Sequence, residues 1–115
     1  MPAPTLNREA CEKLDHIGDV FGLNDSGIGS LFNVQRQSVI GWREHGIPPG
    51  RRATVERLCD LADVLHREII PTRIPEIVRT KDEWLGNRSI LETIRAEGPE
   101  AIYSYLKRLF SYGAA

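Results

Sequence analysis

The sequence predicts an all-α fold, and three observations carry this prediction. Apolar residues recur every three or four positions, which is the spacing that places them on one side of a helix. No segment alternates apolar and polar residues convincingly enough to predict a strand. Glycine and proline interrupt the pattern at intervals that suit helices of ordinary length. Four or five helices are therefore expected in a chain of 115 residues, which is long enough for a core of modest size.

The N-terminal region, residues 5–70, is expected to begin with a helix over residues 7–21. Its apolar face is formed by residues that follow one another at intervals of four, three and four: Ala10, Leu14, Ile17 and Phe21. Gly22 comes directly after the last of them and is predicted to end the helix. A longer helix is expected over residues 51–68, where the apolar side is formed by Val55, Leu58, Cys59, Ala62, Leu65 and Ile69.

Residues 24–49, between these two helices, are typical of a helix-turn-helix. The apolar positions expected inside the motif are Ile28, Phe32, Val34, Val39 and Trp42. Gly29 follows the first of them and is small enough for a second helix to cross closely. Glycine and proline between positions 46 and 50 interrupt the pattern, so the second helix is expected to end near His45.

The second helix of this motif would leave polar side chains at its outward N-terminal end, namely Gln35, Arg36, Gln37 and Ser38. Glutamine amides can pair with adenine edges, and an arginine fork can reach guanine or phosphate. Ser38 and Arg43 are predicted to contact the DNA backbone, together with Arg51 and Arg52 from the following turn. Gly41 would let DNA approach closely. The alternative is a motif used only for packing, with a solvated polar side.

The distribution of charge favours the same surface. The formal net charge is −1, so the chain has no overall basic coat for nucleic acid. Between residues 34 and 57, however, five arginines face two glutamates, whereas the first 23 residues carry more acids than bases. A basic patch confined to the helix-turn-helix suits a phosphate footprint, and ordinary solvated charge is the alternative interpretation.

Beyond residue 70 the pattern changes. Residues 71–75 contain two prolines and predict an extended linker, and residues 76–115 predict a small helical module. Ser89 and Glu92 have the spacing of a capping box, which opens a helix that Gly98 would close. The last helix would then start at Pro99, with an apolar face made by Ile102, Leu106, Leu109 and Phe110. Trp84 is expected in the core, as an anchor against the helix over residues 51–68.

The residues that could carry chemistry are sparse. Cys11 and Cys59 have no paired spacing and are predicted to be small buried thiols rather than a disulfide or metal site. The three histidines show no ligand spacing, and no nucleophile is accompanied by a base. The sequence therefore predicts no catalytic site, no metal and no cofactor. No apolar run reaches the length of a membrane span or a signal-peptide core, which predicts a cytoplasmic protein.

Two segments near the C-terminus resemble a known family. The run Trp84-Leu-Gly-Asn-Arg-Ser-Ile-Leu-Glu-Thr-Ile94, followed by Gly98 and by Tyr105-Leu-Lys-Arg-Leu109 up to Gly113, is similar to the toxin-binding domain of Xre/MbcA/ParS-type antitoxins. That domain typically carries a Leu-Gly-Gly-Arg-(Ser/Thr)-Pro-Leu-Glu-Leu-Leu pattern. Asn87 stands where the family has its second glycine, and Ile90 stands where it has proline. With the upstream helix-turn-helix, the resemblance covers nearly all of residues 7–115.

The resemblance implies a type II antitoxin that binds a RES-domain toxin, an enzyme that consumes cellular NAD. Such antitoxins commonly repress their own operon through the helix-turn-helix, so operator DNA, a homodimer and a hetero-oligomer with the toxin are expected. In the family the C-terminal end lies at the entrance of the toxin's active site. Carried onto this sequence, the expected toxin contacts are Lys107, Arg108, Ser111, Tyr112, Gly113, Ala114 and Ala115. The alternative is a stand-alone regulator of the phage Cro/CI type, whose C-terminal half serves only to dimerise.

Overall fold

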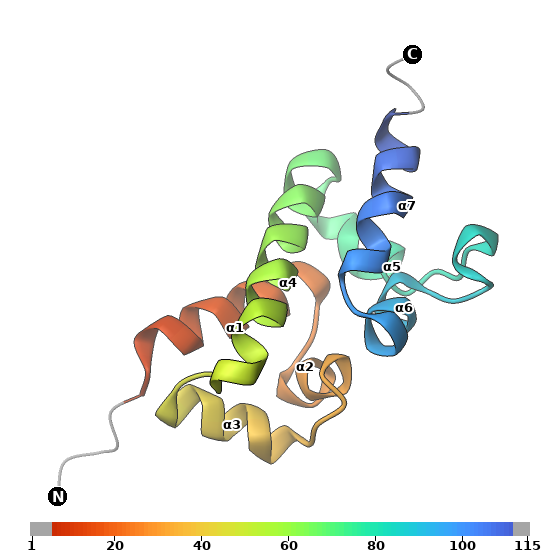
Figure 1. Ribbon diagram of the computed structural model, residues 1–115. Coiled ribbons are helices and arrows are strands. Elements are labelled where there is room, and N and C mark those ends of the chain that lie inside the picture. The colour runs from red at the N-terminus through yellow and green to blue at the C-terminus, as the bar shows by residue number, and fades with distance from the viewer. Residues whose placement is uncertain (1–5, 112–115) are drawn as a thin grey trace, which may run out of the picture.

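The computed structural model describes residues 6–111, and every regular element in this range is a helix (Figure 1). In chain order the elements are α1 (Arg8–Phe21), α2 (Asp25–Leu31), α3 (Arg36–His45), α4 (Pro49–Glu68), the 3₁₀-helix η1 (Pro71–Arg73), α5 (Ile74–Ile77), the 3₁₀-helix η2 (Glu83–Leu85), α6 (Ile90–Glu97) and α7 (Glu100–Ser111). The predicted all-α class is confirmed, with more helices than the sequence indicated.

Local signals set the two ends of α1. The side chain of Asn7 accepts a hydrogen bond from the backbone N–H of Ala10 at 2.9 Å, which satisfies a donor at the start of the helix. Gly22 ends the helix in the left-handed conformation, with φ of 72°. Leu14, Ile17 and Phe21 are fully buried on the predicted face. In Figure 1, α1 runs across α4, and these two helices form the largest contact in the fold.

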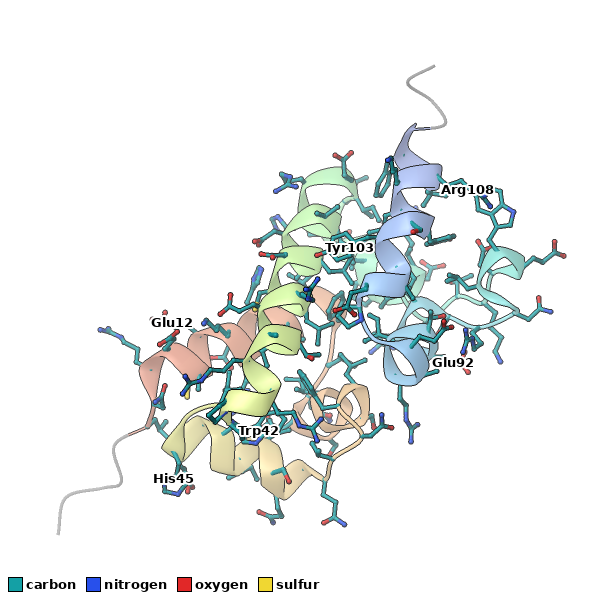
Figure 2. All side chains as sticks on the ribbon, viewed as in Figure 1. Glu12, Trp42, His45, Glu92, Tyr103 and Arg108 are labelled. Atoms are coloured by element: carbon teal, nitrogen blue, oxygen red, sulfur yellow. The ribbon has the colours of Figure 1, made fainter. Side chains whose placement is uncertain are left out.

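α2 and α3 are joined by four residues, 32–35, and pack tightly against each other. Gly29 is buried at their junction, where a Cβ atom would lie 2.7 Å from the carbonyl oxygen of Val34. No residue larger than glycine fits there without a shift of the backbone. The ring of Phe32 meets that of Trp42 edge-on, with centroids 5.2 Å apart. Figure 2 shows Trp42 pointing from α3 into the molecule.

α4 begins at Pro49, two residues earlier than the periodicity predicts. Proline lacks a backbone N–H, but the first residues of a helix have no intrahelical acceptor for that group in any case. The proline–glycine pair therefore opens the helix instead of preceding it. The C-terminal end at Glu68 agrees with the prediction.

The predicted extended linker is wrong, because residues 71–77 are helical. Pro71 opens η1 and Pro75 lies in the first turn of α5, so both prolines occupy positions that tolerate them. Ile74 is 0% exposed and belongs to the same buried cluster as the residues of α1 and α4. The guanidinium group of Arg79 donates to the carbonyls of Phe21 (2.8 Å) and Gly22 (2.7 Å) at the end of α1. The second half of the chain therefore packs directly on α1.

α7 completes the fold beside α4, and α6 packs against α7 and α2. The predicted capping box is present: the Ser89 hydroxyl accepts from the N–H of Glu92, and the Glu92 carboxylate accepts from the N–H of Ser89. Ile102 and Leu106 bury the apolar side of α7. Figure 2 shows Tyr103 between α7 and α4, where its hydroxyl donates to the carbonyl oxygen of Arg57 at 3.1 Å.

Trp84, which was expected in the core, and Leu109, which was expected on the apolar face of the last helix, are both on the surface. Leu109 is 40% exposed and Trp84 is 54% exposed. η2 is a single short turn in which Leu85 turns inward and is buried, so the neighbouring Trp84 faces outward. The Trp84 ring lies against Tyr105, with centroids 6.3 Å apart, and does not anchor the module to α4.

Candidate functional site

The N-terminal end of α3 presents a group of exposed polar side chains. Gln35, Arg36, Gln37 and Ser38, all predicted to face DNA, are exposed. On the opposite side of the helix, Val39 and Trp42 are buried, and these two residues hold α3 against the core. Gln35 is the N-cap residue but its side chain makes no capping hydrogen bond. These four side chains are thus available to a ligand that approaches this end of the helix.

The outward side of α3 is also free of bulk at Gly41. A Cβ atom built on Gly41 meets no atom within 4 Å, so the chain itself does not require glycine there. Gly41 lies one turn after Gln37 on the same side of the helix. The surface that begins at Gln37 therefore continues along α3 without an intervening side chain.

The contacts of Arg43 differ from the contact with the DNA backbone that the sequence predicts. Its guanidinium group donates to both carboxylate oxygens of Asp25 on α2 and to Asp15 on α1, with the shortest distances at 2.8 Å. Its side chain is only 20% exposed. Because these partners occupy the guanidinium group, Arg43 joins helices inside the fold rather than facing a phosphate.

Arg51 and Arg52 lie at the start of α4 and each holds a backbone carbonyl. Arg51 Nη1 donates to Phe32 at 3.0 Å, which ties the start of α4 to the α2–α3 connection. Arg52 Nε donates to Ile47 at 3.1 Å, and the rest of its side chain is exposed. Arg51 thus places positive charge beside the α2–α3 connection, whereas Arg52 holds the α3–α4 connection and lies on the side of Asn7 and Glu9.

The candidate toxin contacts fall partly within the described chain. Lys107 and Arg108 are exposed on α7, and Ser111 is the last residue of that helix. Tyr112, Gly113, Ala114 and Ala115 lie outside the described residues. The guanidinium carbon of Arg108 lies 5.2 Å from the centre of the Trp84 ring, and Figure 2 shows Arg108 reaching from α7 toward the η2 turn.

A hydrogen bond from α7 holds the η2 turn beside that helix. The Tyr105 hydroxyl donates to Asp82 Oδ2 at 2.8 Å, while Asp82 Oδ1 accepts the backbone N–H of Trp84, also at 2.8 Å. Burial, together with the hydrogen bond to the Asp82 carboxylate, raises the pKa of Tyr105 to about 12. Trp84 therefore lies on the surface between Tyr105 and Arg108. Sequence reasoning placed Trp84 in the core, although its acidic neighbours and Gly86 are signals of an exposed turn.

The two cysteines are partly exposed and unpaired in the described residues. Cys11 Sγ lies 3.5 Å from the carbonyl oxygen of Arg43, and Cys59 Sγ lies 3.7 Å from that of Lys13. Burial raises the pKa of the Cys59 thiol to about 11. Each thiol acts as a weak donor between helices. Within residues 6–111, no three His, Cys, Asp or Glu side chains are grouped so that they could hold a metal ion.

No family model matches this chain, and none of the curated proteins or solved structures with which it was compared matches it either. Among the described helices, none combines the length and the apolar character needed to cross a membrane. Two surfaces of the described residues are open to a partner: the exposed N-terminal end of α3, and the pair formed by Trp84 of η2 and Arg108 of α7.

Proposed function

We propose that this protein is an antitoxin that binds a RES-domain toxin through its C-terminal region and operator DNA through α3. The observation that carries the antitoxin assignment is the backbone of the turn before α6. Gly86 and Asn87 both adopt the left-handed conformation, with φ of 71° and 62°, and Ser89 then caps α6. This is the segment whose sequence resembles the toxin-binding domain of Xre/MbcA/ParS-type antitoxins.

Both departures from the pattern of that family suit this backbone. Asparagine is among the few residues other than glycine that enter the left-handed region readily, so Asn87 can replace the second glycine of the family. Ile90 is the first residue of α6, a position at which proline is favoured but not required. The two replacements therefore preserve the turn that the family pattern encodes.

The DNA-binding part of the proposal rests on α2, its four-residue connection and α3, which we interpret as a helix-turn-helix. Arg36 and Gln37 would reach base edges in the major groove, while Ser38, Arg51 and Arg52 would contact phosphates. Gly41 supports this proposal because the helix leaves that position open although nothing in the fold requires it. An autorepressor of this kind acts in the cytoplasm as a symmetric dimer, with half-sites about one helical turn apart.

The surface of this protein that contacts the toxin would comprise Lys107 and Arg108, continued by residues 111–115. We add Trp84, because Arg108 stacks on its ring and the pair offers the aromatic and guanidinium groups that dominate binding energy at protein interfaces. Leu109 extends this surface along α7. The toxin would therefore present an apolar hollow flanked by carboxylates.

Co-expression with the product of the neighbouring gene tests the antitoxin assignment. We expect the two chains to purify as one complex and the antitoxin to restore growth to cells that produce the toxin. Trp84→Ala should weaken the complex, whereas Trp84→Phe should retain most of the affinity. Failure of the neighbouring product to bind would instead favour the phage-type regulator.

Deletion of residues 112–115 separates toxin binding from toxin inhibition. If this segment covers the active-site entrance, the shortened protein should still co-purify with the toxin through Trp84 and α7 but should lose most of its protection of growing cells. Operator binding by the shortened protein is the control and should not change. Full protection by the shortened protein would show that the segment does not inhibit the toxin.

DNA binding is tested by gel shifts on the DNA upstream of the gene. Arg36→Ala or Gln37→Ala should weaken operator binding by about 1–3 kcal/mol and relax specificity. Arg52→Ala should instead weaken binding to all sequences alike and reduce the dependence on salt. Unchanged binding by the double variant of Arg36 and Gln37 would contradict the role of α3.

A further inference from the structure

Arg43 joins three helices through one side chain. On α3 it donates from Nη2 to Asp25 Oδ1 at 2.8 Å and from Nε to both Asp25 oxygens at 3.2 Å, and Asp25 is the first residue of α2. From Nη1 it donates to Asp15 Oδ1 on α1 at 2.8 Å. The backbone carbonyl of Arg43 also accepts the N–H of Asn7, at 2.7 Å, at the start of α1. Both the side chain and the backbone of this residue therefore connect α3 to its neighbours.

The contacts of Arg43 have a directional geometry, which the apolar contacts of α3 lack. Val39 and Trp42 are the only residues of α3 that are buried, and they lie on one narrow side of the helix. Apolar contacts along such a line hold the helix close to the core but resist its rotation weakly, because they have no directional geometry. The guanidinium fork is directional and meets carboxylates on two separate helices.

The site is partly shielded from water, so these contacts are stronger than ordinary surface ion pairs. The side chains of Arg43 and Asp25 are 20% and 25% exposed, whereas that of Asp15 is 61% exposed. The hydrogen bond to Asp25 raises the pKa of Arg43, which keeps its guanidinium group charged at any physiological pH. We call this guanidinium group, together with the carboxylates of Asp25 and Asp15, the clamp. Without the guanidinium group, the carboxylates of Asp15 and Asp25 would lose the cation that both of them contact.

We propose that Arg43 is a positioning residue that sets the orientation of α3, and with it the reach of Arg36 and Gln37 into DNA, without contacting DNA itself. The inference rests on the proposed DNA binding. Arg43 follows Gln37 by six residues, so a rotation of α3 permitted by loss of the clamp would displace the outward side chains at its other end.

The test compares Asp25→Asn with Asp19→Asn. Both variants remove one carboxylate, but Asp19 is exposed on α1 and has no ion-pair partner among residues 6–111. Binding is measured to a duplex from the DNA upstream of the gene and to a shuffled duplex of equal composition. If only charge mattered, both variants would bind both duplexes more tightly. The clamp predicts instead that Asp25→Asn lowers the ratio of the two affinities roughly tenfold, the size of one lost base contact, while Asp19→Asn leaves it unchanged.

Arg43→Lys provides the second arm, because it keeps the charge and loses the fork. A lysine can still contact a phosphate as a point charge, so preserved affinity would overturn the proposal. We expect the affinity ratio to fall as in Asp25→Asn, with the slope of binding against salt unchanged, whereas a lost phosphate contact reduces that slope by about 0.9. Circular dichroism establishes that each variant is folded.

The outcomes separate this inference from the proposed function. Equal binding of Asp25→Asn and Asp19→Asn, with Arg36→Ala still impaired, overturns the clamp and leaves DNA binding by α3 intact. No preference of the unmodified protein for the upstream duplex overturns both.

Discussion

Gly41 is a position where stability and DNA binding should change in opposite directions. A methyl group at this position meets no atom of the protein, and alanine is favoured over glycine inside a helix. Gly41→Ala should therefore raise the free energy of unfolding by about 0.5–1 kcal/mol. If DNA lies against this side of α3, the same change should weaken operator binding. Urea denaturation and gel shifts measure the two effects, and equal or tighter binding would contradict a close approach of DNA at Gly41.

Trp84 and Trp42 form a matched pair for testing which aromatic residue supports the fold. Trp84 is 54% exposed and contacts one aromatic ring and one guanidinium group, so Trp84→Ala should lower the free energy of unfolding by about 1–2 kcal/mol. Trp42 is buried against Phe32, and Trp42→Ala should cost roughly 3–5 kcal/mol. Chemical denaturation measures both, and equal losses would contradict the surface position of Trp84.

The Cys59 thiol should be slow to react and should make stability depend on alkaline pH. Burial raises its pKa to about 11 from an ordinary value of 9.0, so little thiolate forms at pH 8 in the folded protein. A raised pKa means that its contribution to stability is complete below pH 9 and is lost as the pH rises toward 11. Alkylation of Cys59 should be much slower in the folded protein than in urea. Cys59→Ala should remove this part of the alkaline loss of stability.

At the scale of elements, the α2–α3 connection depends on Gly29. Its position lies so close to Val34 that a methyl group would meet a backbone oxygen at 2.7 Å. Gly29→Ala should therefore lower the free energy of unfolding by about 1–3 kcal/mol, whereas the same substitution at Gly41 is expected to raise it. Thermal denaturation of the two variants measures this contrast. A stabilising effect of Gly29→Ala would show that the two helices can separate without cost.

Helix ends were predictable from the sequence because they depend on residues close together in the chain. Gly22 and the Ser89–Glu92 box act within one turn of the helix they cap, although the start of α4 was predicted two residues too late. The exposed end of α3 was predictable for the same reason, since the spacing of Val39 and Trp42 already defines its inward side. The partners of Arg43 were not, because Asp25 and Asp15 lie 18 and 28 residues away in the chain.

The environments of Pro71, Pro75 and Trp84 could not be predicted from the residues next to them in the chain. Pro71 and Pro75 are compatible with either an extended linker or the first turn of a helix, and only the burial of Ile74 against α1 decides between them. Trp84 and Leu85 are both large and apolar, and a single turn cannot bury both. The sequence does not state which of the two faces inward.

At the scale of the whole molecule, one buried cluster connects the region before residue 70 with the region after it. Ile74 and Val78 are fully buried, and Arg79 binds the carbonyls at the end of α1. A fragment of residues 1–70 would expose the side of α1 that α5 covers. We expect such a fragment to be less helical and to melt well below the full chain, as measured by circular dichroism. A fragment extended to residue 80 is the control and should regain much of this loss.

Asn33 and Arg95 exchange two hydrogen bonds between the N-terminal and C-terminal regions, and this contact affects how the protein can evolve. Asn33 Nδ2 donates to the Arg95 carbonyl and Arg95 Nε donates to Asn33 Oδ1, both at 3.1 Å, so the α2–α3 connection is fitted to α6. Recombination that joined the N-terminal region of this protein to the C-terminal region of a distant homologue would pair surfaces that were never selected together. If α7 and Trp84 bind the toxin as proposed, a change of partner specificity should therefore arise by point substitutions at these positions, and not by exchange of whole segments.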